Sequence, residues 1–159
     1  MKKKISFILN GEKREANVWP NQILLNFLRE EIGIKSPKSG CERGDCGSCT
    51  VLINNQSVKS CLVLAVEIDE QSVTTIEGLM KEGELSQLQK SFLKNNSFQC
   101  GFCAPGMIIS SHELLEEKTN PTTNDIKEAI SGNLCRCTGY LPIIDAIKDL
   151  SLEDRTSHE

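Results

Sequence analysis

The sequence predicts an α+β fold in which a small domain of strands and one helix precedes a domain made of helices. Strand-like segments on either side of an Asn-Gly turn open the chain, and a glycine-bearing loop with few large apolar residues follows them. From about residue 84 onward, apolar residues recur at helical spacing and no convincing strand appears. We therefore expect two domains, residues 1–78 and residues 79–159.

The first domain is expected to open with a β-hairpin. Lys4–Leu9 alternates weakly between apolar and polar residues and predicts a strand, and Asn10-Gly11 is a strong signal for a two-residue turn. Arg14–Val18 is the expected return strand. Apolar residues at i, i+3 and i+4 spacing then predict an amphipathic helix over residues 23–31.

A loop over Ser36–Cys49 separates this helix from the remaining strands. Its proline and its three glycines favour irregular backbone over a helix or a strand. Thr50–Ile53 and Ser57–Leu62 predict two strands across an Asn54-Asn55 turn, and Ser72–Ile76 predicts a further short strand. These segments complete the small α+β domain.

The second half of the chain predicts four helices that pack as a small bundle. Apolar residues at helical spacing lie in Glu84–Leu93, Met107–Glu117 and Tyr140–Leu150. A shorter helix is expected over Asp125–Ile130, with Thr122 or Thr123 as its N-terminal cap. The apolar stripes of all four helices are interpreted as core packing.

Composition and charge narrow the class of protein. The net charge of −4 and the single basic run at the N-terminus argue against a nucleic-acid-binding surface. No run of about 18 apolar residues predicts a membrane span, and the apolar part of Met1–Leu9 is too short for a signal peptide. We expect a cytoplasmic protein, in which eight cysteines indicate metal or redox chemistry rather than a disulfide framework.

The first group of cysteines predicts a [2Fe–2S] cluster. Its spacing is Cys-x4-Cys-x2-Cys followed by a distant fourth cysteine, which is the plant-type ferredoxin pattern. Each iron of such a cluster takes two thiolates, so three ligands from one tight loop and a fourth from a strand complete the site. Glycines within the loop allow left-handed backbone angles and bring N–H groups close to sulfur. The predicted ligands are Cys41, Cys46, Cys49 and Cys61.

The second group of cysteines predicts another cluster of the same kind. It combines a Cys-x2-Cys pair with a Cys-x-Cys pair, and we expect each pair to begin a helix. Two helix N-termini would then direct free N–H groups and positive dipole ends at a negatively charged centre. The predicted ligands are Cys100, Cys103, Cys135 and Cys137.

Other uses of the cysteines stay open at this point. Four cysteines can also hold a tetrahedral zinc ion, although neither group contains the two Cys-x2-Cys knuckles that are usual for zinc ribbons. Disulfides would be strained at these spacings and would require an oxidising compartment. A thioredoxin-like redox pair at Cys100 and Cys103 would require a preceding parallel βαβ pattern, which the sequence does not show.

Three motifs together resemble the iron–sulfur subunit of the molybdenum hydroxylases, the family of xanthine dehydrogenase, aldehyde oxidoreductase and carbon monoxide dehydrogenase. They are GCERGDCGSCTV at residues 40–51, QCGFCAPGM at 99–107 and GNLCRCTGY at 132–140. The resemblance extends over roughly residues 4 to 150. It implies an N-terminal β-grasp ferredoxin-like domain and a C-terminal four-helix domain, each with one [2Fe–2S] cluster.

The resemblance also implies a role for each group of cysteines. The cluster of the first group corresponds to the one nearer a flavin, and the cluster of the second group to the one nearer molybdenum. Gln99 and Cys137 match positions that contact the pterin of the molybdenum cofactor in this family. The spacing alone favours the other interpretation, in which Gln99 is a loop residue whose side chain hydrogen-bonds its own backbone.

The predicted function is electron transfer within a larger oxidoreductase. The resemblance implies a large molybdenum-binding subunit, which carries the pterin cofactor and oxidises the substrate, and a medium FAD-binding subunit that accepts the electrons. Neither His112 nor His158 belongs to an evident catalytic array, and no phosphate-binding loop appears. The alternatives are a free-standing ferredoxin-like carrier, a zinc-stabilised interaction module and a regulator that senses oxidation through a labile cluster.

Overall fold

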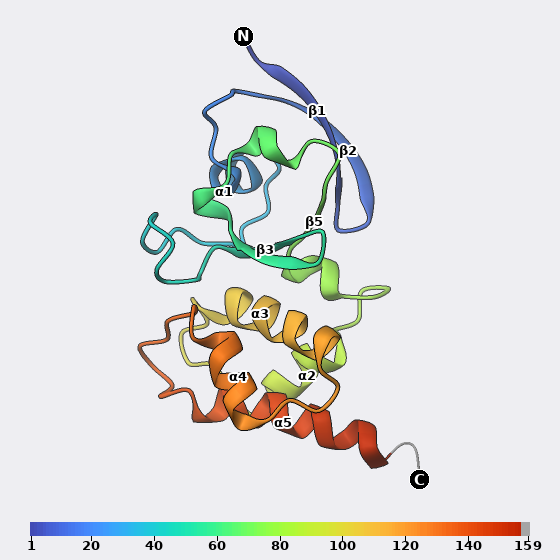
Figure 1. Ribbon diagram of the computed structural model, residues 1–159, viewed down its shortest axis with the longest axis vertical. Helices are drawn as coiled ribbons and strands as arrows, with labels where there is room; N and C mark the ends of the chain where they lie inside the picture. The colour runs from blue at the N-terminus through green and yellow to red at the C-terminus, as the bar shows by residue number, and fades with distance from the viewer. Residues whose placement is uncertain (157–159) are drawn as a thin grey trace.

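The computed structural model describes the backbone of residues 1–156 and the side chains of residues 1–150, so His158 lies outside the described residues. All five strands lie at one end of the molecule, and α2 to α5 lie at the other end, with α3 running beneath β3 (Figure 1). The predicted α+β class is therefore confirmed. No helix of the described residues is long and apolar enough to cross a membrane.

The five strands form one mixed sheet in the order β2-β1-β5-β3-β4. β1 pairs antiparallel with β2 and parallel with β5, and β3 pairs antiparallel with both β4 and β5. The strands are β1 (Lys3–Leu9), β2 (Glu12–Val18), β3 (Thr50–Ile53), β4 (Gln56–Lys59) and β5 (Ser72–Thr74).

Both predicted tight turns are present. Asn10 and Gly11 have φ angles of 51° and 85° between β1 and β2, and Asn54 and Asn55 have φ angles of 49° and 67° between β3 and β4. Two successive residues in the left-handed region are what a two-residue hairpin with right-handed strand twist requires. Asparagine tolerates that region better than other residues with a side chain, so turn chemistry fixed both hairpins.

The predicted helix over residues 23–31 is present but changes its geometry midway. α1 (Leu24–Asn26) continues as a π-helical turn over Phe27–Glu31, in which the N–H of Ile32 bonds to the carbonyl of Phe27. The wider turn keeps the apolar face of this helix on the sheet. Phe27 is fully buried there, and its ring meets that of Phe7 edge to face at 5.8 Å.

Two predicted strands end earlier than expected. The Ser57–Leu62 strand stops at Lys59, and Ser60–Leu62 forms a 3₁₀ turn because the N–H and hydroxyl of Ser60 both bond to the carbonyl of Cys49. Cys61 therefore lies on a turn and not on a strand. Likewise the last predicted strand stops at Thr74, and Ile76–Leu79 forms another 3₁₀ turn.

The helices of the second half begin within one to three residues of the positions that the sequence predicts. α2 begins after Ser86, which forms a capping box with Gln89. α4 begins after Thr122, whose hydroxyl accepts from the N–H of Asp125, so Thr122 is the cap of the two candidates. The helices are α2 (Gln87–Lys94), α3 (Ala104–Glu117), α4 (Thr123–Ile130) and α5 (Leu141–Thr156).

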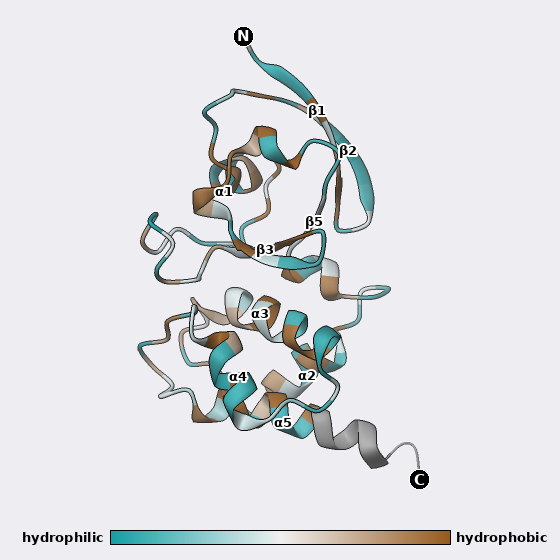
Figure 2. Cartoon of the chain, in the orientation of Figure 1, coloured by the Kyte–Doolittle hydropathy of each residue, from teal (hydrophilic) through white to brown (hydrophobic). Residues whose placement is uncertain are grey.

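Two large hydrophobic cores, and a small cluster of Leu25, Cys49 and Cys61, hold the molecule together. One lies between the sheet and α1, where Figure 2 shows apolar ribbon on α1 and β3 and hydrophilic ribbon along the edge strand β2. The other is built from α2 to α5 and includes Leu52 of β3. α3 therefore packs on the sheet as well as on the other helices, and the carboxylate of Glu113 accepts from the N–H of Ser57 at 2.8 Å.

Candidate metal centres

The first cysteine group gathers beside α1, where Cys49 and Cys61 pack with Leu25. Three of the thiols come from the loop before β3, and Cys61 comes from the turn after β4. Cys49 and Cys61 are buried, with 2% and 7% of their surface exposed, whereas Cys41 and Cys46 are half-buried. The group therefore consists of an inner pair and an outer pair.

Glycines let this loop fold around its thiols. Gly44 and Gly47 have φ angles of 89° and 73°, a region that side chains rarely adopt. Gly40 has ordinary backbone angles, but a Cβ there would lie 2.8 Å from Cys46 Sγ. The expectation of left-handed glycines is thus confirmed for two positions, and the third glycine makes room for sulfur.

Backbone N–H groups point at the thiol of Cys41, one of the outer pair. N–H groups of Arg43, Cys46 and Asp45 lower the pKa of Cys41 to about 7, and the N–H of Cys46 lies 3.4 Å from its sulfur. Burial has the opposite effect on Cys61 and raises its pKa to about 11. Such N–H groups stabilise thiolate charge and would do the same for an anionic cluster.

The second cysteine group lines a hollow of about 210 Å³ between the two halves of the chain. Cys137 Sγ lies 3.8 Å from Cys100 Sγ, and both side chains are exposed. Cys103 is buried beside Cys135, and burial raises its pKa to about 12. This group therefore repeats the arrangement of an inner pair and an outer pair.

Only one of the two expected helix starts occurs at the second group. Cys103 is the N-terminal cap residue of α3, but α5 begins at Leu141, four residues after Cys137. The prediction that Cys135 and Cys137 begin a helix is wrong because Gly139 and Tyr140 adopt φ angles of 66° and 70°, which interrupt helical geometry.

Side chains replace the missing helix start. The Thr138 hydroxyl donates to Cys135 Sγ at 3.1 Å, and the N–H of Cys135 donates to the Tyr140 hydroxyl at 2.9 Å. Burial is the largest single influence on the pKa of Cys135 and raises it. The hydrogen bonds from Thr138 and the Cys137 N–H outweigh burial, so the pKa of Cys135 is lowered overall.

The paired arrangement fits a binuclear cluster. Within the part of the chain that the structure describes, no three histidine, cysteine or carboxylate side chains converge on one ion position. The thiols of each group lie instead in two pairs. A [2Fe–2S] cluster requires such pairs, because each iron takes two thiolates. Each group offers four free thiols, the soft sulfur ligands that such a cluster takes.

Gln99 and Cys137 lie side by side in the structure. The side-chain amide of Gln99 donates a hydrogen bond to the backbone carbonyl of Cys137 at 3.1 Å, and both residues are exposed. The bond to backbone crosses between two loops 38 residues apart, not within one loop. One amide hydrogen and the amide oxygen of Gln99 are left for a ligand.

Lys38 is a site residue that sequence reasoning missed. Its ammonium lies 5.6 Å from the centre of the Phe102 ring, between Cys100 and Cys103 in sequence. Burial lowers the pKa of Lys38, and the two neighbouring thiols partly oppose that shift. A lone lysine in a loop carries no spacing signal, so only the folded geometry identifies it.

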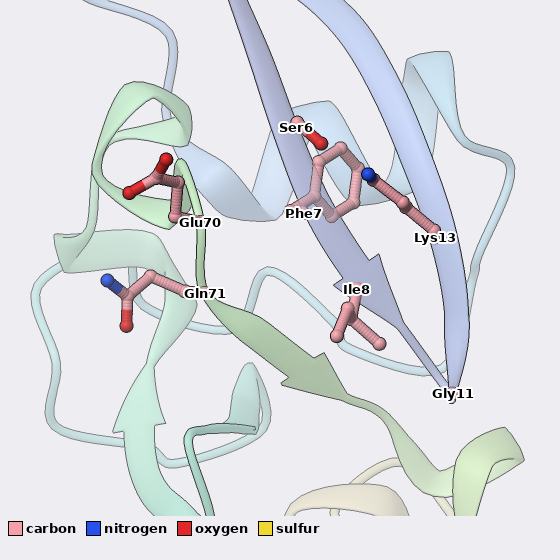
Figure 3. Close-up of a pocket in the computed structure, with 7 residues that line it drawn as sticks. All are labelled: Ser6, Phe7, Ile8, Gly11, Lys13, Glu70 and Gln71. Atoms are coloured by element: carbon pink, nitrogen blue, oxygen red, sulfur yellow. The ribbon is translucent and has the colours of Figure 1, made fainter.

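The largest hollow described outside the cysteine groups, about 450 Å³, lies beside β1 and has no metal-binding character. The lining side chains come from β1, from β2 and from the segment at Glu70 and Gln71, whose backbone is hydrogen-bonded to Ser6 and Ile8 of β1 (Figure 3). No thiol lines it, and Lys13 and Glu70 approach it from different elements. We therefore place the chemistry at the cysteines.

Two domain families match the chain. Residues 7–86 match a 2Fe-2S iron-sulfur cluster binding domain, and residues 75–148 match a [2Fe-2S] binding domain. Fold and site together thus define an electron-transfer protein with two [2Fe–2S] clusters.

Individual relatives identify the family. The chain is 46% identical to the nicotinate dehydrogenase small FeS subunit of Eubacterium barkeri, which covers 91% of this chain and 92% of that protein. It is 44% identical to the nicotine 6-hydroxylase small subunit of Paenarthrobacter nicotinovorans, over 89% of this chain and 85% of that one. The crystal structure of quinoline 2-oxidoreductase from Pseudomonas putida 86 superimposes with a TM-score of 0.93 at 43% identity, over 99% of this chain and 97% of that chain. This chain belongs to the small iron–sulfur subunits of the molybdenum hydroxylase family.

Proposed function

We propose that this chain carries single electrons from a molybdenum centre on a large partner subunit, through its two clusters, to FAD on a medium partner subunit or to another acceptor. The observation that carries the proposal is the repeated arrangement of two thiol groups, each with an inner and an outer pair, in neighbouring loops. The clusters supply one-electron chemistry when bound, and the protein supplies ligands, N–H groups and a fixed spacing.

The proposed ligands follow the two groups. The cluster of the β-grasp domain, residues 1–78, is the one nearer the flavin, and the cluster of the four-helix domain, residues 79–159, is the one nearer molybdenum. The first is held by Cys41, Cys46, Cys49 and Cys61, and the second by Cys100, Cys103, Cys135 and Cys137.

We assign the face around the second cluster to the large subunit. The outer thiols Cys100 and Cys137 are exposed there, and Gln99 lies beside them with free hydrogen-bonding capacity for a pterin edge. Exposed apolar side chains lie around these thiols, with 44% of Phe102 and 55% of Leu134 accessible to solvent. Large exposed apolar side chains around a polar centre are typical of surfaces that a partner covers.

A free-standing carrier is the weaker alternative. The relatives are named as small subunits, and the apolar rim of the second cluster would be exposed permanently in a carrier. A cytoplasmic complex, in which thiols stay reduced, fits eight free cysteines.

The names of the relatives suggest the class of substrate. Nicotinate, nicotine and quinoline are all aromatic or partly aromatic nitrogen heterocycles. We propose that the complex oxidises a nitrogen heterocycle, which reduces the clusters of this chain. Anaerobic bleaching of the purified complex by nicotinate or quinoline, but not by simple aldehydes, would support this; bleaching by aldehydes alone would contradict it.

Metal analysis and EPR test the two-cluster proposal. Anaerobically purified protein should contain about four irons and about four acid-labile sulfides per chain, and dithionite should produce two distinguishable spin signals. Cys103→Ser should remove one signal and Cys49→Ser the other, because the two sites use separate ligands. Zinc without sulfide, or loss of both signals in each variant, would contradict the assignment.

A further inference from the structure

Asn133 is a buried polar residue between the two centres. It lies two residues before Cys135, and only 1% of its surface is exposed. Its N–H donates to the carbonyl of Ile130, and its own carbonyl accepts from the Tyr140 hydroxyl at 3.2 Å. The backbone on both sides of Asn133 is therefore anchored to the helical half of the chain.

The side chain of Asn133 reaches the other cysteine loop. Its amide nitrogen donates to the carbonyl of Gly47 at 3.0 Å and lies 3.4 Å from the Thr50 hydroxyl. The next residue, Leu134, donates its N–H to the carbonyl of Cys46 at 2.9 Å. Adjacent residues of one loop thus bind adjacent residues of the other, each within two positions of a proposed ligand.

The contact between Gly47 and the Gly132–Asn133 backbone is tightly packed. A Cβ at Gly47 would lie 2.3 Å from the carbonyl of Gly132 and 2.6 Å from the Asn133 amide nitrogen. The Ser110 hydroxyl of α3 donates to the other end of the amide at 2.8 Å. Since Ser110 occupies the amide oxygen, the amide N–H₂ is turned toward Gly47, so the orientation of Asn133 is fixed from both ends.

We propose that Asn133 is a positioning residue for electron transfer between the two clusters. This inference rests on the ligands proposed above. One electron leaves the reduced cluster of the helical domain, which returns to two ferric irons, and enters the other, which becomes mixed-valence. No bond or proton changes. Asn133 holds the Cys46 and Cys135 loops at one spacing, which sets the coupling between the clusters.

The test is EPR of the fully reduced, cluster-loaded chain. Two nearby paramagnetic clusters split each other's signals at low temperature, and this splitting falls steeply with separation. Asn133→Ala should retain both signals but shrink the splitting, because the side-chain bond from Asn133 to Gly47 is lost and only the backbone bond from Leu134 to Cys46 still joins the two loops. Ser91→Ala is the matched control, since it also removes a buried hydrogen bond, to the carbonyl of Ala146, but joins α2 to α5 and lies on no cysteine loop.

A milder variant keeps the proposal testable if Asn133→Ala does not fold. Ser110→Ala removes only the bond that orients the amide, and it should reduce the splitting by less. Wild-type splitting in a folded Asn133→Ala protein, or in Ser110→Ala when the first variant fails, would overturn the role of Asn133. Absence of iron–sulfur signals from the wild-type chain would instead refute the proposed function.

Discussion

The carbonyl oxygen of Gly47 lies against the backbone of Gly106, so that a Cβ at Gly106 would lie 2.2 Å from this oxygen. Gly106 belongs to the first turn of α3, and Gly47 belongs to the loop between Cys46 and Cys49. The first cysteine loop therefore rests directly on the helix that begins at Cys103. Stability of the interface between the two halves and integrity of the first centre are linked at this contact.

Substitution Gly106→Ala should destabilise the protein by about 1–3 kcal/mol, the range for overpacking a closed contact. The clash is with backbone, which cannot rotate away as a side chain can. Thermal unfolding of the cluster-loaded protein measures the effect. Gly132→Ala is the control, because the nearest atom to its Cβ would be the flexible tip of Lys59 at 3.4 Å. Equal melting temperatures for the two variants would contradict the argument.

Elements whose geometry depends on their own residues could be predicted from the sequence. Elements whose geometry depends on contacts with distant residues could not. The Asn10-Gly11 hairpin and the Thr122 cap depend on residues within the element itself, and both were predicted. The 3₁₀ turn at Cys61 was not, since it depends on hydrogen bonds from Ser60 to Cys49, eleven residues away. The same limit applies to Cys135 and Cys137, which do not begin a helix because the backbone of Gly139 and Tyr140 is left-handed.

The candidate site likewise contains residues that the sequence identified and residues that only the structure identified. Spacing alone grouped the eight cysteines, because ligands that share a loop leave a pattern in the sequence. The roles of Asn133, Thr138 and Lys38 were not predicted, although the first two lie within the 132–140 motif, because each depends on a partner that only packing supplies. The bond from Asn133 to Gly47 joins residues 86 positions apart and exists only when α3 lies on the sheet.

Substitution Gln99→Ala should slow electron entry into the clusters while both clusters remain. Loss of one hydrogen bond of about 1 kcal/mol corresponds to a roughly fivefold lower rate of cluster reduction by substrate in the assembled complex. Rapid-mixing absorbance measures this rate. Gln87→Ala, an exposed glutamine on α2, should leave it unchanged. An unaltered rate for Gln99→Ala would remove the proposed pterin contact.

Thr138 should tune the cluster of the helical domain. A hydroxyl that donates to a ligand sulfur withdraws charge and favours the reduced, more negative cluster. Thr138→Val should therefore lower the reduction potential of that cluster by on the order of tens of millivolts and leave the other cluster unchanged. EPR-monitored redox titration distinguishes the two signals. Thr138→Ser, which keeps the hydroxyl, should restore most of the potential; a valine variant with the wild-type potential would exclude the effect.

The ion pair between Lys118 and Asp125 should stabilise α4 over a wide pH range. Their charged atoms lie 2.6 Å apart, and hydrogen bonding to Lys118, then to Thr122, lowers the pKa of Asp125 to about 2. The same contact raises the pKa of Lys118.

The sign of the pH dependence follows from these shifts. A lowered carboxyl pKa contributes stability above the ordinary value of 3.8, and this is lost as the pH falls toward 2. The raised lysine pKa contributes below its ordinary 10.5, and this is lost only as the pH rises above that value. Asp125→Asn, which keeps an oxygen for the Thr122 N–H, should lower the melting temperature by a constant amount from pH 6 to pH 9. If the difference in melting temperature between the variant and the wild type changes with pH within this range, another titrating group controls the stability of α4.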